Sequence, residues 1–513
     1  MSSASVPMPD PVDPAAPTSR ASVSWILIAV AAVSAVVIGG GAFAVMAVVG
    51  GGGDRPDSAM PGNAAFYAEI DIDPSVGQKV AALQFFDGMD TTELEEMRDG
   101  RGREALFDLI ADEPDSPLSE MDYEADVEPW LGDRVGVGAI AGATEDEWVP
   151  VFAVQVKDEP AAEAFVDDVM AQEEASDEAD FFFRGDYMVF TEVEDAESVK
   201  MAMDAGTLAD NETYTSDMDS LGPQGIMSVW ANLPAFQELS DTYSADVEQS
   251  LSDVGASQLL DSQAELQGRM AGTLRFDEDA IEFHGVAIDT GADTIEGGDS
   301  AQLISSLPDD TVAAFGLENG DQYVDQVWTV LEEAFPEDVA QAQEEAAAEG
   351  FELPGDIKTM VGDSLVVAAG PGIVDLDGNN ADDVPVGYQA STDGEAAVAL
   401  LEKVMEASGE DLGVPYGGKD GVFTVAGSEA YFDSLVAGGD LGSTRDFEVA
   451  VPDADEADMA AYVSLNQLES LYLPEFEQGQ ERDMAETMAA VGMRASSDGE
   501  GSGSFTLRLV FDE

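Results

Sequence analysis

Two stretches that lie far apart in the chain repeat each other. VPVFAVQVKDEPAAEAFVDDVM (149–170) aligns without a gap with VPVGYQASTDGEAAVALLEKVM (384–405), and nine of the 22 positions are identical. In each copy, an alternating apolar segment typical of a strand precedes apolar residues with helical spacing. Those residues are Ala162, Phe165, Val166, Val169 and Met170 in one copy, and Ala397, Leu400, Leu401, Val404 and Met405 in the other. We expect both stripes to pack against a sheet rather than to bind a ligand.

Further segments match in the same order along the chain. They are 61–71 with 308–318, 127–138 with 357–368, 187–199 with 420–432, and 268–289 with 491–512. The offset between matched segments drifts, so insertions fall in loops while the elements keep their order. We therefore predict a tandem duplication, with repeat 1 over 61–290 and repeat 2 over 300–513. Each copy is long enough to bury its own core.

Within each copy, the spacing of turns predicts antiparallel strands. The acidic link GATEDE (142–147) and the turn at Gly185-Asp186 each join two apolar alternating segments, which is typical of a hairpin. Such short links forbid an all-parallel sheet. Asp158 is placed to cap the helix that follows it. The predicted fold class is α+β, with antiparallel sheets and helices mainly on one face, built twice.

The N-terminal region predicts a membrane anchor. Residues 1–22 are rich in Pro, Ser and Ala and are expected to form a disordered cytoplasmic tail. Residues 23–50 carry no charge and are long enough for one transmembrane helix, with Trp25 at its start. Residues 51–60 are Gly-rich and predict a flexible linker. The alternative is a cleaved signal peptide that ends at Ala42-Phe43-Ala44.

The charge of the chain limits its partners. Asp and Glu number 107 against 19 Lys and Arg, which gives a net charge of −88, and the chain has no cysteine. Such a surface repels nucleic acid and anionic membranes. It is typical of adaptation to high salt or of a solubility device, and the alternative is a surface for weakly bound cations or a cationic partner. The absence of cysteine excludes disulfides, thiolate metal sites and cysteine nucleophiles.

Several of these motifs resemble a bacterial family of membrane-anchored proteins that carry domain of unknown function 3352. The resemblance rests on the short Pro-rich tail, the single span, IDIDPSVGQKVAALQFF (70–86) and VEPWLGDRVGVG (127–138). It covers roughly residues 61–512. The second copy departs from the first, because Met360 stands where the first has Trp130. The resemblance implies a membrane anchor, an exported location and an α+β fold. It implies no activity and no catalytic residue.

The sequence offers few candidate catalytic residues or motifs. The single histidine, His284, is expected to face solvent beside Glu282 on a strand whose Ile281 and Phe283 face inward. No G-x-S-x-G, S-x-x-K, Walker or G-x-G-x-x-G motif occurs.

The loop DLDGNNADD (Asp375 to Asp383) is the best metal candidate. Asp375, Asp377 and Asn379 have the spacing of a calcium loop, but Asn380 replaces the usual glycine and no glutamate stands at the twelfth position. It is interpreted as a polar turn, with a weak calcium site as the alternative. The sequence assigns no catalytic, cofactor-binding or metal-binding residue.

The sequence therefore predicts a single-pass protein with its N-terminus inside and the bulk of the chain outside. Its expected role is non-enzymatic binding or scaffolding in the cell envelope, with the lipid bilayer as a partner through the N-terminal helix and a cell-envelope protein or polymer as a possible second partner. The alternative is an extracytoplasmic hydrolase that uses a pair of carboxylates.

Overall fold

The computed structural model describes residues 53–71, 77–78, 121–142, 148–172, 179–242, 267–277, 279–291, 302–373, 384–409, 413–476, 482, 485–498 and 501–512. The predicted tail (1–22) and transmembrane helix (23–50) lie outside these residues, as does the loop from Asp375 to Asp383. Within the described part of the chain, no helix is both long enough and apolar enough to cross a bilayer.

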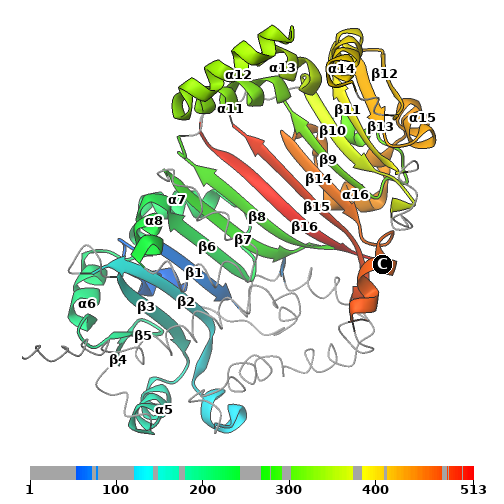
Figure 1. Ribbon diagram of the computed structural model, residues 1–513. Helices are drawn as coiled ribbons and strands as arrows, with labels where there is room; N and C mark the ends of the chain where they lie inside the picture. The colour runs from blue at the N-terminus through cyan, green and yellow to red at the C-terminus, as the bar shows by residue number, and fades with distance from the viewer. Residues whose placement is uncertain are drawn as a thin grey trace, which may run out of the picture.

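The described strands form one antiparallel sheet of 16 strands (Figure 1). The strands of the N-terminal half are β1 (Phe66–Asp71), β2 (Leu131–Ala141), β3 (Trp148–Val156), β4 (Ala179–Arg184), β5 (Tyr187–Glu192), β6 (Met227–Asn232), β7 (Arg269–Phe276) and β8 (Ala280–Ile288). Those of the C-terminal half are β9 (Ala313–Glu318), β10 (Ser364–Ala369), β11 (Val386–Ser391), β12 (Tyr416–Lys419), β13 (Val422–Ala426), β14 (Met459–Ser464), β15 (Met488–Ser497) and β16 (Gly503–Phe511). The predicted α+β class with antiparallel strands is confirmed.

The two halves meet where β8 pairs with β16 at the centre of the sheet. Outward from this pair, the strand order is β8-β7-β6-β1-β2-β3-β5-β4 on one side and β16-β15-β14-β9-β10-β11-β13-β12 on the other. Each strand of one half thus has a counterpart at the same place and in the same chain order in the other half. The sequence did not predict that the halves share one continuous sheet.

The helices are α5 (Glu159–Gln172), α6 (Ala196–Ala205), α7 (Glu212–Ser220), α8 (Leu233–Thr242), α10 (Gln302–Ser305), α11 (Gly320–Ala334), α12 (Pro336–Ala348), α13 (Gly355–Val361), α14 (Gly394–Ser408), α15 (Glu429–Ala437), α16 (Arg445–Ala450) and α17 (Glu469–Tyr472). Shorter helical turns lie at η2 (Pro56–Ala59), η3 (Tyr123–Val127), η5 (Leu208–Asp210), η9 (Leu441–Ser443), η10 (Ala454–Glu456) and η11 (Leu473–Glu475).

Local signals placed several of these elements correctly. Both 149–170 and 384–405 are a strand followed by a helix. The Oδ1 atom of Asp158 accepts a hydrogen bond from the amide of Ala161 at 3.1 Å, as expected for a cap. Gly185 has a φ of 57° in the turn between β4 and β5, a conformation that glycine adopts at no steric cost. Val404 departs from the predicted stripe, because its side chain is 45% exposed.

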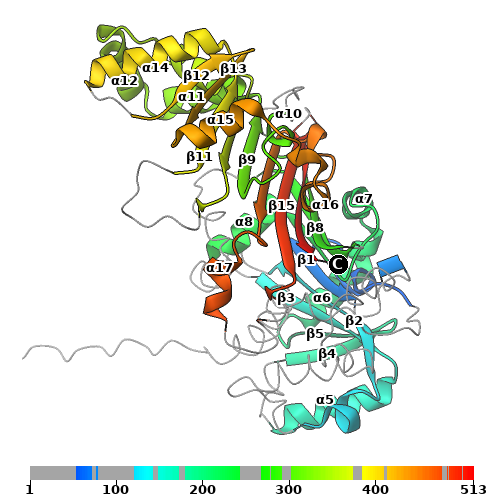
Figure 2. The ribbon, with the colours of Figure 1, turned by 90° about the vertical axis from the view of Figure 1, so that its right-hand side faces the viewer.

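Helices lie on both faces of the sheet, so the prediction that they lie mainly on one face is wrong. In Figure 2, α10 and α16 lie on one side of the strands, and α12 and α14 lie on the other. We call the side that carries α6, α7, α10, α15 and α16 the first face, and the opposite side the second face. Helix α5 packs against Trp130 and the neighbouring Phe residues of β4 and β5, and α8 packs beside Phe66.

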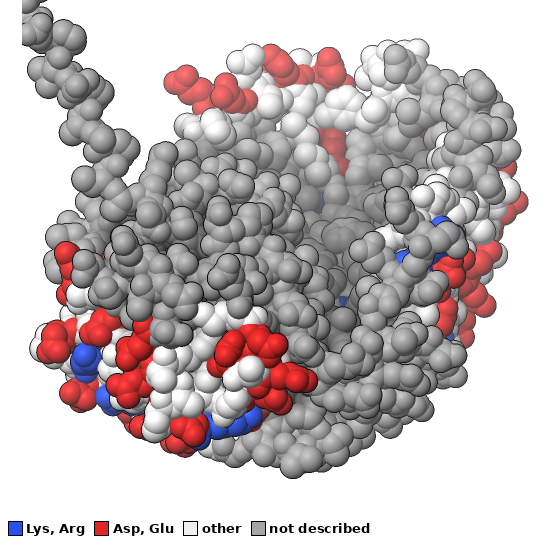
Figure 3. All heavy atoms as spheres, turned by 90° about the horizontal axis from the view of Figure 1, so that it is seen from below, with Lys and Arg blue, Asp and Glu red and all other residues white. Residues whose placement is uncertain are grey.

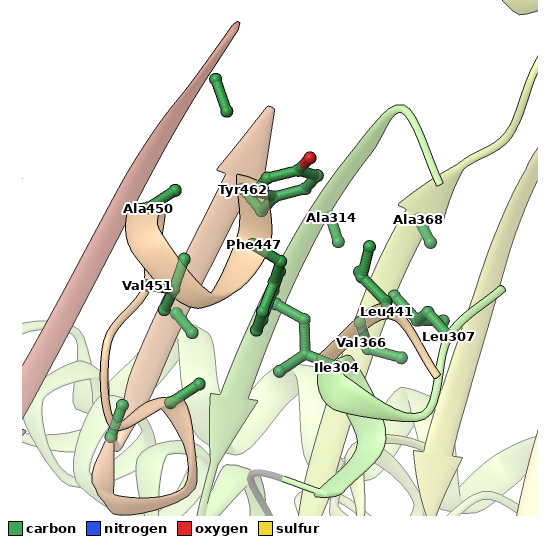
Figure 4. Packing of buried hydrophobic residues seen from close by; sticks show 14 of the residues in the cluster. Ile304, Leu307, Ala314, Val366, Ala368, Leu441, Phe447, Ala450, Val451 and Tyr462 are labelled. Carbon is green, nitrogen blue, oxygen red and sulfur yellow. The ribbon is translucent and has the colours of Figure 1, made fainter. Parts of the chain in front are cut away.

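Two hydrophobic cores lie on the first face. One belongs to the N-terminal half, where Met203, Tyr214 and Met218 of the helices cover Tyr67 and Trp230 of the sheet. The other belongs almost entirely to the C-terminal half, where Ile304 of α10 and Phe447 of α16 cover β9, β10 and β14 (Figure 4). Each half therefore buries a core of its own, which agrees with the length of each predicted repeat.

The segment that precedes β1 packs against the sheet. Pro56, Ala59 and Met60 are buried around η2, and the Tyr187 hydroxyl donates to the Asp54 carbonyl at 2.7 Å. The prediction of a flexible linker over 51–60 is therefore wrong for residues 56–60. The prediction relied on the Gly-rich composition of this segment and overlooked its apolar residues, which pack against the first face.

Candidate functional site

The second face of the central strands is apolar except for Ser497 at the end of β15. Strand pairing places one row of side chains side by side across six strands, from Val367 through Phe315, Ala461, Met493 and Leu507 to Phe283. We call the second-face residues of these strands the apolar face: Leu365, Val367, Ala313, Phe315, Leu317, Met459, Ala461, Val463, Val491, Met493, Ala495, Phe505, Leu507, Leu509, Ile281 and Phe283. None of these residues is charged or carries a hydrogen-bonding side chain.

Part of the apolar face is exposed. The side chains of Phe315, Val367 and Leu507 are 37%, 42% and 45% exposed, although each belongs to a strand with neighbours on both sides. The Phe283 and Phe505 rings pack together with their centroids 5.7 Å apart. Soluble proteins rarely expose contiguous apolar surface of this kind unless it binds something.

On another side of the molecule, the described surface is rich in carboxylates. Figure 3 shows Asp and Glu side chains gathered on the described part of one side of the molecule, with few Lys or Arg side chains among them. This distribution fits the net charge of −88. The contrast between a carboxylate-rich surface and an uncharged sheet face sets the apolar face apart.

The first face of the same central strands holds the charged residues, and they are paired. Glu282 is 2% exposed and lies between two arginines. Its Oε1 accepts a hydrogen bond from Nε of Arg275 at 2.6 Å, and its Oε2 accepts one from Nε of Arg508 at 2.7 Å. A buried carboxylate needs such partners, because its charge is otherwise costly to remove from water.

His284 lies next to this cluster, half-buried on the first face. Its Nδ1 is 3.1 Å from Oγ1 of Thr506 on β16. Burial lowers the pKa of His284, and the positive charges of Arg275, Arg494 and Arg508 lower it further against the opposing effect of Glu282. The sequence predicted a solvated histidine beside a solvated Glu282. That prediction is wrong, because the first face is covered where α7 and α16 pack on it.

A polar cavity of about 380 Å³ lies at one end of β10 and β11. It is lined by Asp321, Lys358, Thr359, Gly362, Asp363, Ser391, Thr392, Asp393 and Gly421. The Oδ1 of Asp393 accepts hydrogen bonds from the amides of Glu395 and Ala396, which caps α14. Lys358 pairs with Asp325 at 2.6 Å. These side chains hold helix ends and turns together, so we interpret the cavity as structural.

A second acid, Asp57, is half-buried in the N-terminal half. The Tyr214 hydroxyl donates to Oδ2 of Asp57 at 3.3 Å. Burial raises the pKa of Asp57, and the nearby Arg55 opposes that rise. Arg55 is itself paired with the buried Glu69, which also accepts a hydrogen bond from the Tyr67 hydroxyl at 2.7 Å. Nothing in the sequence pattern of this segment indicated that its charges lie under the helices of the first face.

The described residues contain no group of His, Asp and Glu side chains that could hold a metal ion. The calcium candidates Asp375, Asp377 and Asn379 lie outside the described residues. Comparison with protein-family models, curated proteins and solved structures finds no match to this chain. The resemblance to the family with domain of unknown function 3352 therefore stays a prediction.

Proposed function

We propose that this chain is a membrane-anchored, non-enzymatic binding or scaffolding protein of the cell envelope, and that the apolar face is its binding surface. The observation that carries the proposal is the exposure of Leu507, Val367 and Phe315 on a sheet face without charge. Exposed apolar patches rimmed by polar residues mark sites of interaction with proteins, membranes or ligands.

The anchor in this proposal rests on the charge-free stretch at 23–50. With a short tail before the stretch and a large domain after it, the domain lies outside and the tail inside. The carboxylate-rich surface disfavours nucleic acid as a partner and favours weakly held cations. It also keeps a protein with an exposed apolar face soluble, since like charges repel other copies of the chain.

The arrangement of carboxylates favours binding over hydrolysis. A hydrolase that uses paired carboxylates needs two of them facing one another across a cleft, one with a raised pKa. Among the described residues, Asp57 has a raised pKa, but it lies beneath Tyr214 in the N-terminal half, whereas the polar cavity belongs to the C-terminal half. The Asp393 carboxylate in that cavity already serves as a helix cap.

We also propose that the two halves arose by tandem duplication of one unit, over 61–290 and 300–513. The matched strand order about the β8–β16 pair supports this, as does the sequence identity between 149–170 and 384–405. Duplication of a unit that pairs through its last strand doubles the width of the sheet. The apolar face spans this junction, so a single copy would supply only part of it.

A crosslinking experiment in cells tests the proposed binding surface. A photoactivatable amino acid replaces Leu507, and in a control it replaces Met201, a residue of α6 that is 66% exposed. Illumination is expected to join residue 507, and not residue 201, to a component of the cell envelope. Crosslinks from residue 507 that reach only other parts of the same chain would show that the apolar face is filled internally, and the proposal would fail.

A further inference from the structure

We propose that the apolar face binds the acyl chains of lipids from the bilayer in which the chain is anchored. This inference rests on the proposed function and names the ligand of the same surface. Three observations carry it: the chemistry of the face, its extent, and the short length of chain between the N-terminal apolar stretch and the folded part.

The chemistry of the face fits hydrocarbon better than polypeptide. Its strands pair on both sides, so their amides and carbonyls are used in the sheet, and the side chains of the apolar face offer no donor or acceptor. Protein interfaces carry about one hydrogen bond for every 100–200 Å² of buried surface. Hydrocarbon needs none, and its burial against Phe315, Met493 and Leu507 is favourable in proportion to the area removed from water.

The extent of the face matches an acyl chain. The row from Val367 to Phe283 crosses six strands, which at about 4.8 Å between neighbours spans about 24 Å. The hydrocarbon layer of one leaflet is about 15 Å thick, half of a bilayer core of about 30 Å. An extended acyl chain can therefore lie along the row with apolar contact over its whole length.

The chain places the folded part close to a supply of lipid. The predicted transmembrane stretch ends at Gly50, and the carbonyl of Gly53 already accepts a hydrogen bond from Nη1 of Arg134 on β2 at 2.9 Å. The residues between them reach at most about 10 Å when fully extended. The folded part is thus held near the bilayer surface. Its carboxylates disfavour anionic headgroups, so we expect lipids with zwitterionic headgroups to bind better.

Photolabelling of the full chain tests this proposal. The chain is reconstituted in phosphatidylcholine vesicles that contain a phosphatidylcholine with a diazirine on its acyl chain, illuminated, and digested for mass spectrometry. We expect labelled peptides that contain Phe283, Met493 or Leu507, besides peptides from 23–50. In Leu507→Asp and Val367→Asp the labelling of the sheet peptides should fall roughly tenfold or more, because a carboxylate against hydrocarbon loses its hydration. Met201→Asp should leave it unchanged.

The outcomes separate this inference from the proposed function. Both Asp variants replace side chains that are more than a third exposed, and circular dichroism reports whether each folds. Labelling confined to 23–50 in the unaltered chain would overturn the lipid proposal, as would sheet labelling that neither Asp variant reduces. If residue 507 then crosslinks to an envelope protein in cells, the ligand is a polypeptide and the proposed function stands. If it crosslinks to nothing outside the chain, both fail.

Discussion

Arg508 on β16 and Glu282 on β8 lie opposite each other where the two halves of the sheet meet, and Nε of Arg508 donates to Oε2 of Glu282 at 2.7 Å. Arg275 on β7 donates to the other oxygen of the same carboxylate. One buried glutamate therefore pairs with one arginine from each half of the molecule.

Removal of this carboxylate should destabilise the protein strongly. Glu282→Gln keeps the size of the side chain but leaves Arg275 without its carboxylate partner and Arg508 with only the more exposed Asp277. Loss of one partner of a buried ion pair costs about 3 kcal/mol or more. The control is Asp204→Asn, which breaks the exposed pair with Arg184 and should cost at most about 1 kcal/mol. Urea unfolding measures both free energies. Equal stability of the two variants would mean that Glu282 does not join the halves.

The single histidine provides a direct test of the covered first face. A net charge of −88 would by itself raise the pKa of an exposed histidine, whereas burial and the neighbouring arginines lower that of His284. Nuclear magnetic resonance of the one imidazole should therefore show a midpoint below 6.5. The unfolded chain then binds this proton more readily than the folded chain, so stability falls as the pH drops below about 6.5. A midpoint at or above 6.5 would contradict the placement of His284.

The contribution of Asp57 to stability should depend on pH in the opposite sense to that of His284. Burial raises its folded pKa above 3.8, so the folded state holds the proton more tightly than the unfolded state. Stability associated with this group therefore falls as the pH rises from 3.8 through the folded pKa, and the cost of its buried charge is fully present at neutral pH. Asp57→Asn should raise the melting temperature at pH 7 more than Asp54→Asn does, since Asp54 is exposed. An equal rise would indicate only the loss of one negative charge.

Salt should stabilise the protein as a whole. Carboxylates outnumber basic residues so strongly that most of them lack a partner of opposite charge, and their repulsion is relieved by unfolding. Added sodium chloride shortens the Debye length from about 10 Å at 0.1 M to about 3 Å at 1 M. We expect the melting temperature to rise over this range. A flat or falling melting temperature would show that the acidic surface is not under net repulsion.

Local features of the fold could be predicted from the sequence. The Asp158 cap and the Gly185-Asp186 turn depend on residues adjacent in the chain, so their chemistry is visible in the sequence. The alternation in β8 was visible too, with Ile281 and Phe283 on one side of the strand and Glu282 and His284 on the other.

The sequence could not show which side of such an alternating strand faces solvent. A period of two assigns the apolar side of a strand to the core and the polar side to solvent. At the centre of this sheet the assignment is reversed, since Leu507 is 45% exposed while Thr506 and Glu282 are 8% and 2% exposed. The reason is that the polar residues of these strands pair with partners that are distant in the sequence. Arg508 and Glu282 are 226 residues apart, and only the pairing of β16 with β8 brings them together.

The central claim is that the apolar face is open and receives acyl chains, and spin labelling at Leu507 tests it most directly. The chain has no cysteine, so Leu507→Cys and Met201→Cys each provide a single thiol for a nitroxide. In phosphatidylcholine vesicles, paramagnetic resonance compares the access of oxygen, which partitions into hydrocarbon, with that of a water-soluble nickel chelate. We predict that oxygen reaches the label at 507 far better than nickel, and that nickel reaches the label at 201. Equal access of nickel to both labels would contradict the claim.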